Sequence, residues 1–187
     1  MHLSIKNMVC PRCIESVKMT LNRMGCKNAK VDLGTVVTEK PMTDKQLQRF
    51  SNELRDSGFE IIQDRDSKIT NDIKVGIIRY IEHLEESKNP SRLSDFISDQ
   101  IHLNYSYASS IFSKKTGDTI EQYFIRMKIE RVKELLSFRK WTLSEIAHQL
   151  HYSSVQYLSN QFKKVTGKTV TDYLKQQNPE RSSIDQI

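Results

Sequence analysis

The sequence contains few of the residues that make turns, and few cysteines. Its 187 residues include 6 Gly, 4 Pro and 3 Cys, so helices should dominate and a disulfide scaffold is excluded. No apolar run approaches the ~18 residues of a membrane helix, and the N-terminus lacks the basic-then-apolar pattern of a secretory signal. No Ser-His-Asp grouping and no glycine-rich phosphate loop is present. We therefore expect a cytoplasmic protein without a membrane partner and without enzymatic activity.

The positive charge is unevenly distributed along the chain. The formal net charge is +6, and residues 91–175 carry 13 basic and 8 acidic side chains, a net of +5. Residues 1–68 carry 12 basic and 9 acidic side chains, together with all three cysteines and the apolar-polar alternation typical of strands. This excess favours an anionic partner, most strongly for the second segment.

A shift in composition predicts two domains. The stretch from residue 63 to residue 68 is wholly polar, and nearly everything after it has helical periodicity. We predict an α+β domain at 1–66, an all-α domain at 67–178 and a polar tail at 179–187. The first domain should contain strands at 3–8, 29–39 (a strand or a hairpin) and 59–62, and helices at 14–24 and 43–57, which favours a small sandwich.

The second domain contains an internal repeat with an offset of fifty residues. Residues 107–123 match residues 157–173 without a gap, and a constant offset indicates two copies of one structural unit. The identities are Tyr107/Tyr157, Ser109/Ser159, Phe112/Phe162, Lys114/Lys164, Thr116/Thr166, Gly117/Gly167, Thr119/Thr169 and Tyr123/Tyr173.

Each copy has the pattern of a helix, a turn and a second helix. In the second copy, Thr142 and Glu145 form a capping box, Ser154 can cap the second helix, and Gly167 suits the left-handed position after it. Two short helices joined by a tight turn are typical of the helix-turn-helix, whose second helix lies in the DNA major groove.

A long helix is predicted between the copies, from Thr119 to about Ser137. Thr119 and Gln122 provide a second capping box. Apolar residues recur on two sides of this helix, so it should pack against both units and fix their separation. The two stripes are Ile120, Phe124 and Met127, and Ile125, Ile129, Val132 and Leu136. A single chain would then read two half-sites without dimerising.

Residues from about 70 to 175 resemble the DNA-binding domain of the AraC/XylS family of bacterial transcription regulators. The residues that carry the resemblance lie at 125–136, 143–147, 151–153 and 162–169. The resemblance implies a leading helix before the first unit, with an apolar face formed by Ile73, Ile77, Tyr80, Ile81 and Leu84. The sequence departs from the family pattern at His151, where a Gly is usual in the second turn, and at Val170, where a Pro is usual.

The second helix of each unit supplies the candidate contacts to double-stranded DNA. The resemblance places base contacts on Val155, Gln156, Ser159 and Asn160, and the amides of Gln and Asn can pair bidentately with adenine. The matching positions in the first copy are serines, which specify weakly, so the second unit should dominate sequence choice. These serines are Ser106, Ser109 and Ser110, and the candidate phosphate contacts are Lys114, Lys115, Lys163, Lys164, Arg126 and Arg131.

The N-terminal domain contains the segment Met8-Val-Cys-Pro-Arg-Cys13. It resembles the heavy-metal-associated domain of copper chaperones, which implies a ferredoxin-like fold with the motif in a strand-to-helix loop. The hairpin is shortened around residues 33–35, which allows three strands instead of four. The nearby helix N-terminus favours the deprotonated form of the two thiols. A pair of thiolates at Cys10 and Cys13 suits Cu(I) or another thiophilic ion.

The function of this motif has three readings that the sequence leaves open: a metal site, a redox pair or neither. The leading hypothesis for the whole chain is a sequence-specific DNA-binding regulator with an N-terminal sensory or interaction domain. The competing hypothesis is a metal-handling or thiol-redox protein whose helical part binds a protein partner, such as a metallochaperone. Neither hypothesis fixes the oligomeric state.

Overall fold

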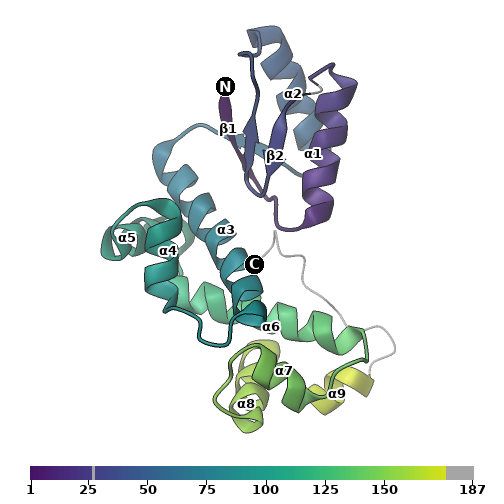
Figure 1. Ribbon diagram of the computed structural model, residues 1–187, viewed down its shortest axis with the longest axis vertical. Coiled ribbons are helices and arrows are strands. Elements are labelled where there is room, and N and C mark those ends of the chain that lie inside the picture. The colour runs from purple at the N-terminus through teal and green to yellow at the C-terminus, as the bar shows by residue number, and fades with distance from the viewer. Residues whose placement is uncertain (27, 176–187) are drawn as a thin grey trace.

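The computed structural model describes residues 1–26 and 28–175, so the predicted tail at 179–187 and the last residues of the predicted domain at 67–178 lie outside the described residues. Figure 1 shows an α+β region above a group of helices, in the order β1, α1, β2, β3, α2, β4 and then α3 to α9. The mostly helical fold class with a small N-terminal sheet is therefore confirmed. The bounds are β1 His2–Lys6, α1 Pro11–Arg23, β2 Lys30–Asp32, β3 Thr35–Val37, α2 Asp44–Asp56, β4 Glu60–Ile62, α3 Arg65–Glu86, α4 Leu93–Ile101, α5 Tyr105–Thr116, α6 Ile120–Ser137, α7 Leu143–Gln149, α8 Val155–Thr166 and α9 Val170–Lys175.

The N-terminal sheet has four antiparallel strands in the order β2-β3-β1-β4. The shortened hairpin therefore reduces the length of its strands to three residues each and not their number. Helices α1 and α2 cover one face of the sheet, because the side chains of Leu3, Ile5 and Val36 form a buried cluster with α1 and α2. Helix α2 begins at a capping box on Thr43 and is followed by Gly58, which has a left-handed conformation.

Helix α1 begins three residues earlier than expected. Its cap is Cys10, and Pro11 occupies the first helical position, where the missing N–H of proline has no cost. Cys13 therefore lies in the first turn of α1 and not in the preceding loop, which corrects the expected start at residue 14. The signal that identifies this start is Pro11 itself.

The polar stretch at 63–68 is the start of a helix and not a linker. Asp64 caps α3 by accepting a hydrogen bond from the Ser67 amide at 2.9 Å, so only two residues separate β4 from α3. Helix α3 also contacts the N-terminal domain: the Asp32 carboxylate accepts a hydrogen bond from the Arg79 guanidinium at 2.6 Å. The same helix therefore belongs to the packing of both regions.

The predicted leading helix is α3, and its five apolar residues are buried as expected. The core of the helical region combines α3 and α6 with apolar residues of both units. At Gly76, a Cβ atom would lie 2.9 Å from the Ile97 side chain, so glycine allows α3 and α4 to approach closely. Helix α6 starts at the predicted capping box of Thr119 and Gln122.

Candidate nucleic-acid interface

The two predicted units share one internal architecture. In the first unit, Phe112 packs edge-on against Tyr123 with ring centroids 5.6 Å apart, and in the second, Phe162 packs in the same way against Tyr173 at 5.4 Å. The hydroxyls of Thr116 and Thr166 each donate a 2.8 Å hydrogen bond to the carbonyl of the phenylalanine four residues earlier. Residues that match at an offset of fifty in the sequence therefore make the same packing contacts in the two units.

The turns of the two units depend on a left-handed residue that is histidine in both. His102 has a φ of 54° and His151 has a φ of 51°. Histidine is among the non-glycine residues that adopt this region more readily, so His151 takes the geometry that the usual glycine would ease. Five residues connect α7 to α8, whereas three connect α4 to α5, so the second turn is two residues longer.

Helix α5 and helix α8 each present a polar face to solvent. Ala108 and Phe112 are buried on α5, as are Leu158 and Phe162 on α8. At 3.6 residues per turn, the residues opposite these positions are Ser106 and Ser110 on α5, and Gln156 and Asn160 on α8. All four are exposed, whereas Ser109 and Ser159 are partly buried at the edge of the face, and Val155 is 37% exposed at the start of α8.

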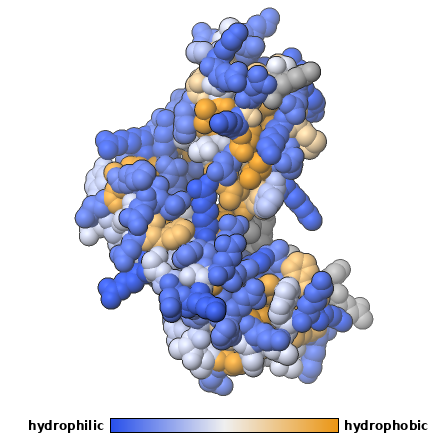
Figure 2. Space-filling view, viewed as in Figure 1, coloured by the Kyte–Doolittle hydropathy of each residue, from blue (hydrophilic) through white to orange (hydrophobic). Residues whose placement is uncertain are grey.

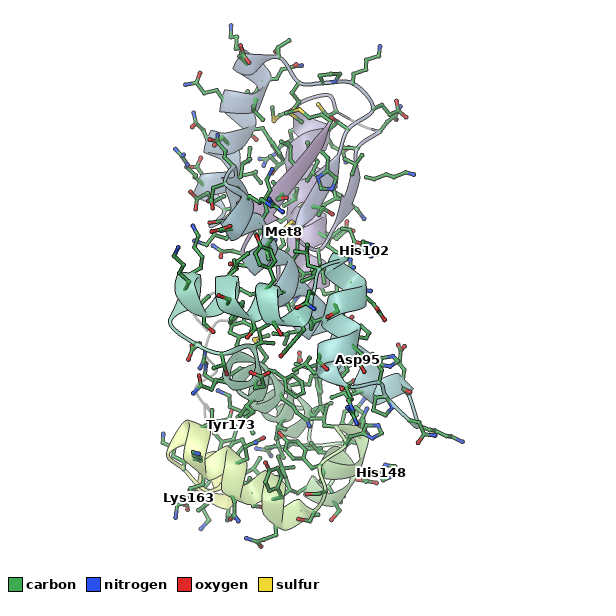
Figure 3. All side chains as sticks on the ribbon, turned by 90° about the vertical axis from the view of Figure 1, so that its left-hand side faces the viewer. Met8, Asp95, His102, His148, Lys163 and Tyr173 are labelled. Carbon is green, nitrogen blue, oxygen red and sulfur yellow. The ribbon has the colours of Figure 1, made fainter. Side chains whose placement is uncertain are left out.

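Neither α5 nor α8 contains an acidic residue, and each ends with two or more basic side chains near its last turn. Figure 3 shows Lys163 on the outside of the second unit, at the end of the molecule distant from Met8. In Figure 2 the surface of this end is mostly hydrophilic, whereas hydrophobic residues show over the strands of the N-terminal region. Each of the two helices thus has an exposed polar face and a basic last turn, and neither contains a carboxylate.

The amide side chains of this face are close enough to act together. Gln156 Nε2 donates a hydrogen bond to Asn160 Oδ1 at 3.1 Å, which leaves the other amide donors of both residues toward solvent. The Ser159 hydroxyl instead donates to the carbonyl of Val155 at 3.0 Å. The second unit therefore offers a paired amide surface, and Ser159 reaches it only by giving up an internal hydrogen bond.

The candidate phosphate contacts fall into two groups. Lys114, Lys163 and Lys164 are exposed. Lys115, Arg126 and Arg131 are engaged within the chain, and their cations are already paired with carboxylates. Lys115 pairs with Asp64 at 3.1 Å, Arg126 with Asp118 at 2.5 Å, and Arg131 with Glu85 through two bonds of 2.5 and 2.7 Å.

Two exposed aromatic residues also lie on these helices, at matched positions of the repeat. Tyr107 on α5 is 46% exposed and Tyr157 on α8 is 54% exposed. They are identical in the repeat although neither belongs to the core. A residue repeated outside the core is the signal that identifies them in the sequence, and the predicted contact set omitted them.

The second unit is held to α3 and α6 by polar contacts. The Nε2 atom of His151 lies 2.8 Å from the carbonyl oxygen of Ser87, just after α3. The Lys128 ammonium of α6 lies 3.9 Å from the centre of the Tyr152 ring. Burial lowers the pKa of Lys128 to about 8. These contacts fix the turn of the second unit against the helices that carry the first.

The two cysteines of the N-terminal motif face each other. Their sulfur atoms are 3.3 Å apart, and both residues are partly exposed. Burial raises the pKa of the Cys13 thiol, and it outweighs the backbone hydrogen bonds at Val9 and Cys10, which lower that pKa. Within residues 1–26 and 28–175, no group of three His, Cys, Asp or Glu side chains joins to form a metal site. Met8 is buried in the core of the domain.

No helix in the described part of the chain is long and apolar enough to cross a membrane. No solved structure was found that matches the chain. A family described as a helix-turn-helix domain matches residues 97–176.

Several curated proteins are similar to the chain, and their names describe regulators. An uncharacterized HTH-type transcriptional regulator, YtdP, of Bacillus subtilis is 30% identical over 136 residues, covering 73% of this chain and 15% of the relative. The Msm operon regulatory protein of Streptococcus mutans is 29% identical over 85 residues, covering 46% of this chain and 30% of the relative. The regulatory protein PocR of Salmonella typhimurium is 28% identical over 102 residues, covering 54% of this chain and 32% of the relative.

The chain thus spans less than a third of the length of each of these three relatives. The similarity agrees with the duplicated units that the structure contains at the matched positions. The match to this helix-turn-helix family begins within α4 and covers the helices of both units.

Proposed function

We propose that the chain is a sequence-specific DNA-binding transcription regulator, with a DNA reader at 67–178 and a sensory or interaction domain at 1–66. The observation that carries this proposal is the pair of matched, acid-free helices, α5 and α8, each with an exposed polar face. Relatives named as transcriptional regulators support it.

In this proposal, α5 and α8 each enter a major groove of the same DNA duplex. Adjacent major-groove faces recur every ~34 Å, and the 18 residues of α6 span ~27 Å at ~1.5 Å per residue. A rigid α6 that packs on both units therefore suits one chain on two half-sites. Regulation by a cytoplasmic DNA-binding protein requires no enzymatic step.

The second unit carries most of the sequence choice in this proposal. Gln156 and Asn160 can each pair with the edge of adenine, at ~1–3 kcal/mol of discrimination. Val155 and Ser159 flank them. Ser106, Ser109 and Ser110 in the first unit accept either base type or a phosphate and add less. Lys114, Lys163 and Lys164 neutralise phosphates, which gives salt-dependent affinity without sequence choice.

Selection of bound fragments from genomic DNA tests the proposal and supplies a site for titration. With that site, Asn160→Ala should lose ~1–3 kcal/mol of preference for one base pair. Lys164→Ala should weaken all sequences similarly and flatten the salt slope by ~1. Unchanged discrimination in Asn160→Ala would remove its base contact, and an absence of any selected sequence would remove the function.

For the N-terminal domain we propose a soft-metal site at Cys10 and Cys13. The sulfur pair supports it, and two facing thiols fit a two-coordinate ion such as Cu(I) better than a tetrahedral one. The strand and helix order of a ferredoxin-like domain supports the resemblance to metal-associated domains. Cys13, whose thiol pKa is raised by burial, would lose its proton when the metal binds.

Equilibrium dialysis with Cu(I) tests this site in the full chain. The parent should take up more Cu(I) than the Cys10→Ser/Cys13→Ser variant, and equal uptake removes the metal site. An insulin-reduction assay separates the redox alternative. DNA footprints with and without Cu(I) then show whether metal alters DNA binding, and identical footprints leave the domain an interaction module.

A further inference from the structure

A cleft of about 830 Å³ lies where the N-terminal domain meets the first unit. One wall is the segment from Lys6 to Val9, which leads directly into the cysteine motif, and the opposite wall includes Lys115, Thr116 and Tyr123. Figure 3 places Met8, one of the lining residues, at this junction. The volume is in the range of small-molecule sites, which occur preferentially between domains.

The carboxylates at this cleft are already paired with cations. Glu60 lies 3.9 Å from Lys6, and Asp64 lies 3.1 Å from Lys115. Asp118 also lines the cleft, and its carboxylate lies 2.5 Å from the guanidinium of Arg126, which lies outside the lining. The remaining positive charges of the cleft are therefore not balanced by carboxylates that line it.

Lys74 is the unbalanced cation that is most enclosed. Lys74 belongs to α3 and lines the cleft. Among the described residues, none of the ion pairs given above, in which the charged atoms lie within 4.0 Å, includes its ammonium group. Its ammonium group lies 4.9 Å from the centre of the Tyr123 ring. Burial lowers the pKa of Lys74, and the nearby cations Lys6 and Arg126 lower it further, while Asp118 acts in the opposite direction.

The rest of the lining combines apolar walls with one unpaired donor. Ile62, Val75 and Ile78 line the cleft beside the Tyr123 ring. Asn71 also lines it, and its amide nitrogen is buried with no hydrogen-bond partner. An apolar wall, an aromatic ring and an enclosed cation suit a ligand that has a hydrophobic body and one anionic group.

We propose that this cleft binds a small organic anion, whose carboxylate or phosphate pairs with Lys74 while its body packs on Tyr123 and the apolar wall. Binding gives the partly desolvated ammonium group of Lys74 an anionic partner, and such a charge-assisted hydrogen bond is favourable.

The position of the cleft suggests how the ligand would act, and this step rests on the proposed DNA-binding function. Lys115 and Thr116 form the end of α5, the DNA-reading helix of the first unit. Lys115 also bonds to Asp64 and Ser67 at the start of α3. An anion in the cleft competes with Asp64 for Lys115, so it changes the contact that sets α5 against α3.

The test is an NMR titration of the full chain with phenyl phosphate, which carries an aromatic body and an anionic head. Amide shifts should change saturably at Asn71, Val75 and Tyr123. Inorganic phosphate, which lacks the body, and benzyl alcohol, which lacks the charge, should each bind more weakly. Lys74→Met should weaken binding of phenyl phosphate by roughly tenfold or more, because one charged hydrogen bond is lost.

Two further variants keep the test sharp. Lys74→Arg retains the cation and should retain binding, whereas Lys45→Met removes an exposed lysine of α2 and should leave binding unchanged. Equal affinity in Lys74→Met and the parent, or shifts confined to α5 and α8, would overturn the site. Because the titration contains no DNA, its failure leaves the proposed DNA-binding function untouched.

Discussion

The two helix-turn-helix units are alike inside and different outside. Their buried phenylalanines, Phe112 and Phe162, pack on matched tyrosines with nearly equal geometry. Their exposed positions differ, since Ser110 in the first unit corresponds to Asn160 in the second. Packing constrains the inside because a core residue must fill its space, whereas an exposed residue is free to change with the surface it contacts. The comparison indicates that the units share a scaffold and differ in the surface that each offers to a partner.

The units also differ in what supports them. The first packs on α3 and is tied to the start of that helix by Lys115. The second packs on α6 and is tied to α3 through the ring of His151. The first unit is therefore placed to respond to the N-terminal domain, and the second is placed by the helices alone.

The largest expected effect on stability comes from removing the buried phenylalanine ring of either unit. Phe112→Ala and Phe162→Ala should each lower the free energy of unfolding by ~3–5 kcal/mol, because each removes a fully buried ring and leaves a cavity. Chemical denaturation measures the loss. Hydrogen exchange should then separate the units, with faster exchange in α7 and α8 for Phe162→Ala while α3 to α5 stay protected.

The matched control is Phe138→Ala, which removes a ring that is 52% exposed. Its effect should stay within ~0.5 kcal/mol, as for most surface changes. A loss as large as that of Phe162→Ala would show that exposure does not decide the cost. Equal exchange in both units after Phe162→Ala would show that the scaffold unfolds as one body.

The next effect depends on pH and belongs to the contact between α6 and the second unit. Burial lowers the pKa of Lys128 to about 8, against ~10.5 for a free lysine. Between these values the unfolded chain binds more protons than the folded chain, so stability should rise with pH. The total rise attributable to Lys128 is about 3 kcal/mol from the usual conversion.

Lys128→Met should lack this rise, so the difference in unfolding free energy between parent and variant should change between pH 8 and pH 10.5. Taking this difference cancels the tyrosines, whose pKa values are raised and which act in the opposite direction above pH 10. A pH-independent difference would show that the ammonium group is solvated in the folded chain.

Much of the helical region was predictable because its signals are local or repeated. The repeat of Phe112 and Phe162 identified both units, and the capping boxes at Thr119 and Thr142 identified two helix starts that the structure confirms. These features depend on residues three or four apart, or on matching copies, which a sequence displays directly.

Contacts between residues that are distant in the sequence could not be predicted in this way. Lys128 and Lys133 are buried on α6, although lysines on a helix are usually solvated. Lys133 is accommodated by a local ion pair with Glu130, three residues earlier, whereas Lys128 is accommodated by the Tyr152 ring, 24 residues away. Arg131 was expected to contact phosphate but pairs with Glu85, 46 residues away in the chain. No local sequence pattern predicts the distant partners of Lys128 and Arg131.

The junction of the two regions provides a smaller effect with a matched control. Gly34 and Gly25 both have positive φ, at 72° and 83°. A Cβ atom at Gly34 would lie 2.8 Å from the Asn71 amide nitrogen and 2.9 Å from the Val75 side chain, whereas one at Gly25 would meet open space. Gly25→Ala should therefore cost ~1 kcal/mol from backbone strain alone, and Gly34→Ala should cost ~1–3 kcal/mol.

Thermal unfolding measures both variants, and limited proteolysis near residue 63 measures the contact between the regions. Gly34→Ala should be cut faster than the parent, and Gly25→Ala should not. Equal proteolysis of the two variants would mean that α3 does not hold the β2–β3 turn in solution. In that case the first unit would be supported by the helical region alone, like the second.

The smallest effect compares the caps of α5 and α8. The Asn104 side chain accepts hydrogen bonds from the amides of Ser106 at 2.9 Å and Tyr107 at 3.4 Å, and the Ser154 hydroxyl accepts one from Tyr157 at 3.0 Å. Asn104→Ala and Ser154→Ala should each lower the free energy of unfolding by ~1 kcal/mol, because an exposed cap is lost without a cavity.

Chemical denaturation of both variants shows whether the units are equivalent at their helix starts as they are in their cores. Asn104→Gly and Ser154→Gly are the matched controls, since glycine at this position should cost only a few tenths of a kcal/mol relative to the parent. A loss confined to Asn104→Ala would mean that the longer second turn positions α8 without its cap. Equal losses would extend the likeness of the units from the core to the helix ends, and leave the exposed faces as their principal difference.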